Sequence, residues 1–209
     1  PACGRCVSCV EGHSNLCDNS ASFPTGMQIG DGTARHHTQD GQDLALMCLL
    51  GTFAEHTVVH ESSTVKIDPN WPLDKACLLG CGVVTGWGSA VYAGEVKPGE
   101  YVAVIGAGGI GANAIQGARA AGARSIAVID PVDFKLDMAK RFGATHSYKS
   151  IDEALGDVGS STWGRGFDVI IMTMGVGDGE ELGKAFWLGN KRARIVVTNI
   201  HPTAEQSIQ

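Results

Sequence analysis

The sequence predicts an α/β fold, with a doubly wound parallel sheet in the second half of the chain and a smaller lobe before it. Three observations support this prediction. Apolar segments alternate with amphipathic ones from residue 101 onward, glycines spaced G-x-G-x-x-G follow the first apolar segment, and four of the seven cysteines lie within the first 17 residues. Segments that are apolar on both faces are typical of parallel strands covered by helices on each side.

The glycine motif follows a predicted apolar strand at residues 101–105. Gly106 permits a tight turn off the strand, Gly108 lets the backbone approach a pyrophosphate, and Gly111 lets the next helix pack closely on the sheet. Gly109 lies in the same turn. The motif therefore predicts a dinucleotide site, although glycine-rich turns also join strands to helices where no ligand binds.

The elements after the motif support the dinucleotide interpretation. A helix of small residues is predicted at 112–121, and its amino end would direct free N–H groups toward the phosphates. A second apolar strand at 125–129 ends on Asp130, 19 residues beyond Gly111. An acid at this position accepts hydrogen bonds from the adenosine ribose, and its charge would repel a 2′-phosphate. NAD is therefore favoured over NADP.

The alternation continues to the end of the chain. Only five strands can be counted, whereas a full doubly wound dinucleotide domain has six, so the sheet is expected to lack its last strand. The remaining predicted elements are helix 134–142, strand 145–148, helix 151–158, strand 168–172, helix 180–188 and strand 194–199.

The amino-terminal cysteines have the spacing C-x2-C-x2-C-x7-C, formed by Cys3, Cys6, Cys9 and Cys17. Four thiolates make a closed tetrahedral zinc site, which is structural because no position stays open for water or substrate. A disulfide framework is one alternative. An iron–sulfur cluster is another, but the ferredoxin spacing differs from this one.

Residues 18–43 are polar and glycine-rich, which predicts a loop. His36 and His37 lie there without a cysteine or acid at ligand spacing, so they are interpreted as solvated rather than metal-binding. An apolar run at 44–50 is expected to enter a core, and strands are predicted at 53–60 and 65–67.

Cys81 follows a predicted helix that starts at Leu73, and it stands between Gly80 and Gly82. Flanking glycines leave a thiolate accessible and let a ligand or another backbone come close. From the pattern alone, a metal ligand and a buried, inert cysteine are both open readings.

Composition limits the classes of function. The chain of 209 residues is 44% hydrophobic, carries a net charge of −6 and has no apolar run of 18 residues. These values predict a globular protein without a membrane span, and the lack of a basic stripe argues against nucleic-acid binding. Clustered cysteines without a visible leader suggest a reducing compartment, so a cytoplasmic location is expected.

The four-cysteine lobe, the segment Gly80 to Gly86 and the glycine motif together resemble the zinc-dependent medium-chain alcohol dehydrogenases. Residues 51–59 and 87–94 look closest to the nicotinoprotein, nitrosoaniline-dependent branch, which holds NAD tightly. The resemblance implies an incomplete, β-rich GroES-like catalytic domain at 1–92 and a truncated NAD-binding Rossmann domain at 93–209. It also implies small alcohols or aldehydes as substrates and a homo-oligomer for the full-length protein.

The resemblance also implies roles for single residues. Cys81 matches the last of three protein ligands to a catalytic zinc, and Thr85 a threonine beside the nicotinamide. Ile110 matches a branched residue behind the ring, and Asp130 with Lys135 the pair near the adenosine ribose. The structural zinc ligands fall on Cys3, Cys6, Cys9 and Cys17.

The family's other two catalytic-zinc ligands lie upstream of the four-cysteine lobe, so the chain looks like the middle of a longer protein and is expected to be inactive alone. A thiol-dependent formaldehyde dehydrogenase of the same superfamily is an alternative activity. A non-catalytic zinc- and nucleotide-binding module is another possibility, and a zinc-ribbon nucleic-acid binder is a third.

Overall fold

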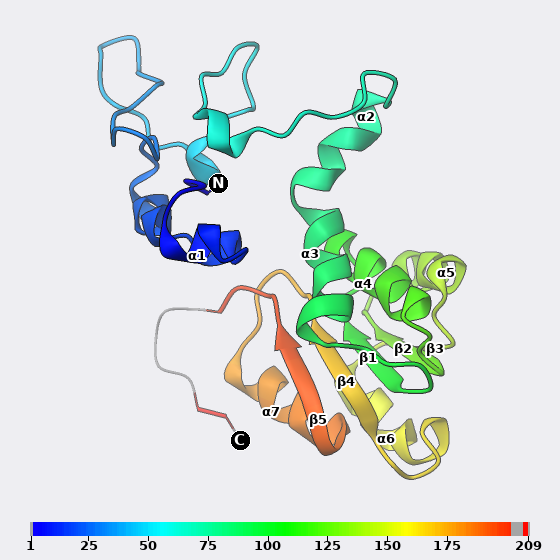
Figure 1. Ribbon diagram of the computed structural model, residues 1–209. Helices are drawn as coiled ribbons and strands as arrows, with labels where there is room; N and C mark the ends of the chain where they lie inside the picture. Colours follow the sequence, from blue (N-terminus) through cyan, green and yellow to red (C-terminus); the bar gives the residue numbers. More distant parts are fainter. Residues whose placement is uncertain (1, 202–206, 209) are drawn as a thin grey trace. The chain divides into compact units, whose positions relative to one another are not determined.

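The computed structural model describes residues 2–201, 207 and 208, with the side chains of residues 21–24 left out (Figure 1). The chain forms two compact units, Pro1–Trp71 and Pro72–Gln209. Each unit is described by itself below.

The second unit contains a five-stranded parallel sheet, as the sequence predicts. The spatial order is β3-β2-β1-β4-β5, so the chain builds outward from β1 in one direction, then returns and builds in the other. The α/β fold is therefore confirmed. The strands are β1 (Tyr101–Ile105), β2 (Ser125–Ile129), β3 (His146–Tyr148), β4 (Phe167–Met172) and β5 (Gly189–Val197).

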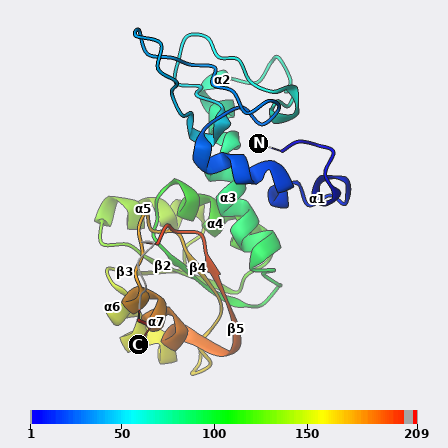
Figure 2. The same ribbon diagram turned by 90° about the vertical axis from the view of Figure 1, so that its left-hand side faces the viewer.

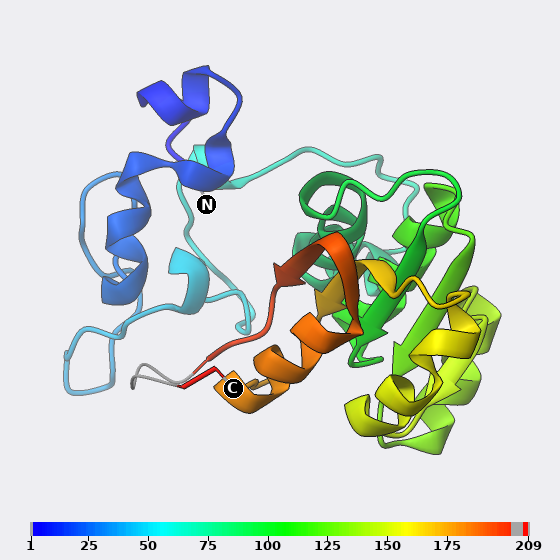
Figure 3. The same cartoon turned by 90° about the horizontal axis from the view of Figure 1, so that it is seen from below.

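Helices cover both faces of this sheet, which explains why the central strands are apolar throughout. Val102 and Val104 of β1 face α4 (Gly109–Ala120) and α5 (Asp133–Phe142), whereas Ala103 and Ile105 face α6 (Ile151–Ser161) and α7 (Gly179–Leu188). Figures 2 and 3 show the sheet between these two helical layers. Burial of each such valine or isoleucine side chain stabilises the folded state by about 1.5–3 kcal/mol.

A helical segment precedes the sheet and packs on α4. It consists of α2 (Leu73–Ala76), a 3-10 turn (Cys77–Gly80), α3 (Gly82–Gly88) and a π-helical turn (Ser89–Ala93). This packing places the boundary between compact units at 71/72, whereas the family-based domain division at 92/93 stays a prediction. Within the described residues no single helix is long and apolar enough to cross a membrane. The two segments Leu73–Gly80 and Gly82–Ala93, which are bent by 50° relative to each other, reach that length and apolar composition only when they are taken together.

The first unit contains short helices and loops. The strands predicted at 53–60 and 65–67 do not form, because neither segment pairs with another in the described part of this unit, and Phe53 and Val65 are exposed. The run at 44–50 reaches the core only through Leu49. His37 forms an isolated antiparallel bridge with Asp43. The helices are α1 (Val7–Val10) and 3-10 turns at Ser14–Leu16, Asp18–Thr25, Met47–Leu49 and Glu61–Ser63.

The contact between α3 and α4 depends on Gly86. A Cβ added there would lie 2.1 Å from the carbonyl oxygen of Ile110, so Gly86→Ala should push the helices apart and lower the free energy of unfolding by about 3 kcal/mol. Gly88→Ala, in the same helix, meets only Tyr92 Cδ2 at 3.8 Å and should stabilise by about 0.5–1 kcal/mol. Urea unfolding measures both, and equal effects would contradict this account.

Candidate functional site

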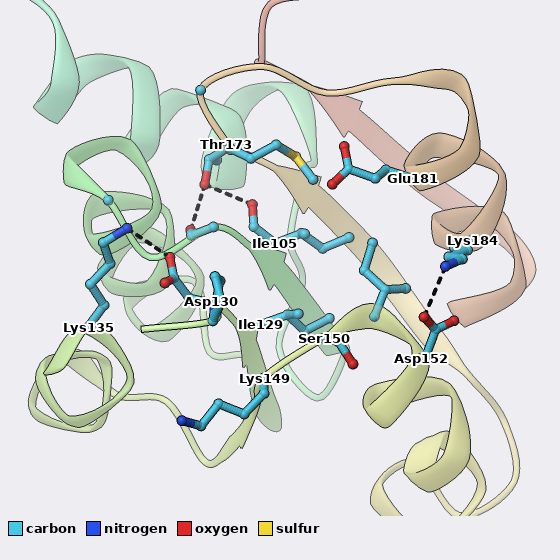
Figure 4. A pocket seen from close by; sticks show the side chains of 16 residues that line it. Ile105, Ile129, Asp130, Lys135, Lys149, Ser150, Asp152, Thr173, Glu181 and Lys184 are labelled. Carbon is cyan, nitrogen blue, oxygen red and sulfur yellow. Dashed lines mark hydrogen bonds and ion pairs between the residues drawn. The ribbon is translucent and has the colours of Figure 1, made fainter. Parts of the chain in front are cut away.

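A cavity of about 510 Å³ opens at the carboxyl ends of the central strands (Figure 4). Its walls come from the residues that end or directly follow β1, β2, β3 and β4, together with side chains of α7. β1 and β4 are neighbours in the sheet, and the chain leaves them in opposite directions. This is the topological switch point at which doubly wound sheets bind their ligands.

The glycine turn shapes one wall of the cavity. Gly106 has φ +96°, and a Cβ on it would lie 2.7 Å from the backbone nitrogen of Met174. A Cβ on Gly111 would lie 1.9 Å from the carbonyl oxygen of Gly106, so the helix can approach the strand only with glycine here. Gly108 and Gly109, by contrast, face open space. Gly106 and Gly111 thus fill the turn and packing roles that the spacing predicts, whereas the approach of Gly108 to a pyrophosphate stays a prediction.

The amino end of α4 is prepared for an anion. The helix begins at Gly109, three residues earlier than predicted, and its N-cap residue Gly108 has no side chain to occupy the free N–H groups. Gly108 also lines the cavity. Free N–H groups and the positive end of the helix dipole favour a phosphate there. The turn therefore fits a pyrophosphate.

Thr173, which the sequence analysis did not single out, fixes the turn from the β4 side. Its hydroxyl lies 2.7 Å from the carbonyl oxygen of Gly106 and 3.1 Å from that of Ile105, and its backbone nitrogen donates to Ile105 at 2.7 Å. The sequence feature that could identify Thr173 as a site residue is its position directly after a buried strand, because doubly wound sheets bind ligands at the carboxyl ends of their strands.

Asp130 ties the end of β2 to the glycine turn. Its carboxylate accepts hydrogen bonds from the backbone nitrogens of Ala107, at 2.9 Å, and Val132, at 3.0 Å, and pairs with Lys135 Nζ at 3.2 Å. Burial raises the pKa of this carboxyl, but these three donors outweigh it and the net pKa is lowered. The charge therefore stabilises the fold at neutral pH, and this stabilisation is lost as the pH falls below about 4 through the lowered pKa.

The carboxylate of Asp130 retains capacity for a ligand. Oδ2 receives two of the three hydrogen bonds and Oδ1 only one, while each oxygen can accept two. Asp130 lines the cavity, and Lys135 beside it is 42% exposed. Asp130 thus has a free acceptor position for a hydroxyl such as that of ribose, and its role toward the cofactor stays a prediction.

The cavity wall contains further charged residues that the sequence analysis does not identify, because they lie on separate elements. Lys184 of α7 pairs with Asp152 of α6 at 2.9 Å and with Glu180 at 3.0 Å, and these acids raise the pKa of the lysine. Figure 4 shows this pair across the cavity from Asp130. Lys149 lines the same cavity and pairs with Asp133.

The four amino-terminal cysteines come together in the first unit. One sulfur from each of Cys3, Cys6, Cys9 and Cys17 lies within 4.8 Å of the others, and they form the only such metal-capable group among the described residues. All seven cysteines are unpaired. Sulfurs on a tetrahedral zinc, at about 2.3 Å from the ion, lie just under 4 Å apart, so thiols within 4.8 Å of one another need only small shifts to hold the ion.

Backbone groups support a thiolate in this cluster. The backbone nitrogen of Cys6 lies 3.4 Å from Cys3 Sγ, and hydrogen bonds from the N–H groups of Arg5 and Cys6 lower the pKa of Cys3 to about 6. Burial raises the pKa of Cys9 to about 11. Cys17 is 1% exposed and packs with Ile29 and Leu49, so the cluster is also the core of its lobe.

The catalytic candidates lie at the start of α3. Cys81 is exposed and precedes the helix, and its carbonyl accepts a hydrogen bond from the backbone nitrogen of Thr85 at 2.9 Å. Ile110 lies in the first turn of α4, where its carbonyl packs on Gly86. Among the described residues, Cys81 belongs to no group of three or more side chains that could hold a metal ion together. Its role as a zinc ligand stays a prediction.

A glycine-rich turn, an acid after the second strand and a cavity at the switch point define a dinucleotide-binding α/β protein. A family model described as "Zinc-binding dehydrogenase" matches residues 109–209. The matched residues, just under half of the chain, form a domain of this family, which implies zinc and NAD-type cofactors generally.

Relatives and solved structures agree. The chain is 45% identical over 200 residues to alcohol dehydrogenase B of Mycobacterium tuberculosis, covering 96% of this chain and 53% of that protein. It is 44% identical over 200 residues, with the same coverage, to the NDMA-dependent alcohol dehydrogenase of Amycolatopsis methanolica. An alcohol dehydrogenase zinc-binding domain protein from Burkholderia ambifaria has a TM-score of 0.87 and 28% identity, covering 99% of this chain and 56% of that chain. The chain thus spans about half the length of the relatives it matches.

Asp130 should set the choice of cofactor. Asp130→Gly removes the acceptor and frees Lys135 to pair with a 2′-phosphate, so NAD affinity should fall about tenfold and the preference over NADP should shrink. Asp137→Ala is the control, because Asp137 lies on α5, the helix that carries Lys135, but is 71% exposed and pairs with Lys140. Titration calorimetry measures both affinities, and unchanged NAD binding in the glycine variant would remove Asp130 from the site.

The cysteine cluster should hold one zinc ion. Cys9→Ser should lose one zinc per chain and unfold the first lobe at lower temperature, while leaving the sheet intact, because the metal and Cys17 form the core of that lobe. Cys77→Ser is the matched control, since Cys77 is exposed and outside the cluster. Atomic absorption and circular dichroism measure zinc and unfolding. Full zinc content in Cys9→Ser, or iron–sulfur absorption in the parent, would contradict the assignment.

Proposed function

We propose that this chain is part of an NAD-dependent zinc alcohol dehydrogenase, which transfers hydride from a small alcohol to NAD. The observation that carries the proposal is the cavity in which an anion-binding turn and the Asp130 carboxylate lie at one switch point. The sequence similarity to proteins named as alcohol dehydrogenases supports the reaction class.

The described residues would divide the binding of NAD among them. The N–H groups at Gly108 and Gly109 would donate to the pyrophosphate, and Asp130 would accept a hydrogen bond from the adenosine ribose. Thr173 keeps the turn in place by its bonds to Ile105 and Gly106. When bound, the nicotinamide supplies the hydride acceptor, and a zinc ion supplies the Lewis acid that lowers the pKa of the alcohol.

Two roles rest on proposal alone. Cys81 would give one thiolate to the catalytic zinc, and its exposure between two glycines leaves the sulfur accessible to an ion. Thr85, one helical turn later, would line the nicotinamide ring with Ile110.

The four-cysteine cluster would hold a separate, structural zinc. A reducing, cytoplasmic location agrees with seven unpaired thiols, and a homo-oligomer of the whole protein is part of the same proposal.

A thiol-dependent formaldehyde dehydrogenase is the second candidate. The chain is 44% identical over 143 residues, or 68% of its length, to a yeast protein named S-(hydroxymethyl)glutathione dehydrogenase. That match covers less of this chain than the matches to alcohol dehydrogenases do. Comparing turnover of primary alcohols with turnover of hydroxymethyl-glutathione separates the two.

Turnover should require more metal ligands than residues 1–209 supply. Among the described residues Cys81 lacks the two further ligands that a catalytic zinc needs, so this segment should bind NAD and one zinc but oxidise no primary alcohol. A version extended at both ends should bind a second zinc and turn over. The measurements are metal content, bound nucleotide and NADH formation. Sustained turnover by residues 1–209, lost in Cys81→Ala, would show a more complete site.

A further inference from the structure

Another pocket of the second unit lies where α3, α4 and α5 meet, with α4 between the other two helices (Figure 1). Its volume is about 400 Å³, and it shares no lining residue with the cofactor cavity. We call it the outer pocket. A volume above roughly 300 Å³ is enough for a small organic molecule. The wall is made of one residue of α3, three of α4 and two of α5: Trp87, Gln116, Arg119, Ala120, Arg141 and Phe142.

The outer pocket lies at the end of α4 away from the glycine turn. Arg119 and Ala120 are the last two residues of this helix of 12 residues, whereas Gly109 begins it. At 1.5 Å per residue, the two ends of the helix stand about 17 Å apart. Arg141 and Phe142 end α5 in the same way. A ligand in the outer pocket would therefore be separate from the nucleotide.

Two glycines shape the wall. A Cβ on Gly117 would lie 3.4 Å from the Cα of Trp87 and 3.3 Å from its carbonyl oxygen, so α3 lies directly on α4 here. Gly143 follows α5 with φ +124°, and a Cβ on it would lie 2.7 Å from the Cδ of Arg119. The side chain of Arg119 thus lies across the end of α5 that carries Arg141.

The two arginines of the outer pocket have no acidic partner. Among the described residues, neither guanidinium group forms an ion pair, a hydrogen bond or a contact over an aromatic ring. Asp137, four residues before Arg141, pairs with Lys140 at 2.9 Å and is not part of the wall. No acid lines the pocket, although the whole chain carries a net charge of −6. Two guanidinium groups in one pocket favour an anion.

The aromatic residues of the wall select the kind of anion. Trp87 is 40% exposed, and Phe142 is partly buried against the core, so an apolar surface borders the charged one. Aromatic faces stack on planar rings, whereas guanidinium groups pair with carboxylate or phosphate oxygens. We infer that the outer pocket binds an aromatic anion, with its ring against Trp87 and its phosphate or carboxylate group on Arg119 and Arg141.

The test uses phenyl phosphate and benzoate as probes, with NAD in excess to fill the cofactor cavity of the purified protein. Either probe should change the tryptophan fluorescence in a saturable way, and Trp87→Phe should lose the signal. Arg119→Gln and Arg141→Gln should each bind the probe about tenfold more weakly, because one charge-assisted contact is lost. Lys140→Gln is the matched control, since Lys140 lies in the same last turn of α5 but outside the pocket, and its affinity should stay within twofold.

Further measurements separate the proposed site from a general effect of charge. Inorganic phosphate and phenol each carry one half of phenyl phosphate, and each should bind at least tenfold more weakly than the better of the two probes. Equal melting temperatures without ligand would show that the arginine variants stay folded. The inference would be overturned by the lack of a saturable signal with both probes, by equally tight binding of inorganic phosphate, or by a loss in Lys140→Gln as large as in the arginine variants.

Discussion

The nucleotide-binding unit depends on the close approach of α4 to the end of β1. A side chain at Gly111 would stand 1.9 Å from the carbonyl oxygen of Gly106, so the absence of one atom decides whether the helix can reach the strand. That approach places Gly108, the N-cap residue of the helix, in the wall of the cavity, where the amino end of the helix favours a phosphate. α3 packs against this same helix at Gly86, where the absence of a side chain lets the two helices come close. Helix packing and anion binding therefore use one backbone arrangement.

Asp130 and Thr173 hold this arrangement from its two sides. Asp130 reaches from β2 to the backbone nitrogen of Ala107, and Thr173 reaches from β4 to the carbonyl of Gly106. The turn is thus fixed by side chains from both neighbouring strands before any ligand arrives. Such preorganisation lowers the entropy that binding must offset. The carboxylate that accepts from the turn also keeps a free acceptor position, which the proposed contact with ribose would use.

The parallel sheet could be predicted from the sequence because its signals are local. Strands buried on both faces are apolar at every position, and 125–129 was predicted with the observed bounds. The predicted start of α4 lies three residues after the observed one. Glycine disfavours a helix in general, but this helix begins with glycines because only they allow its close approach to β1. The strands expected at 53–60 and 65–67 fail for another reason: alternation shows that a segment suits a sheet, but a strand also needs a partner, and no described segment of the first unit supplies one.

The parts of the site that the sequence missed depend on contacts between distant segments. Thr173 meets Ile105 across 68 positions, and Lys184 meets Asp152 across 32. The glycines and Asp130 are visible in the sequence itself because the motif and its spacing are local, whereas Thr173 and Lys184 join the cavity wall only when folding brings distant segments together.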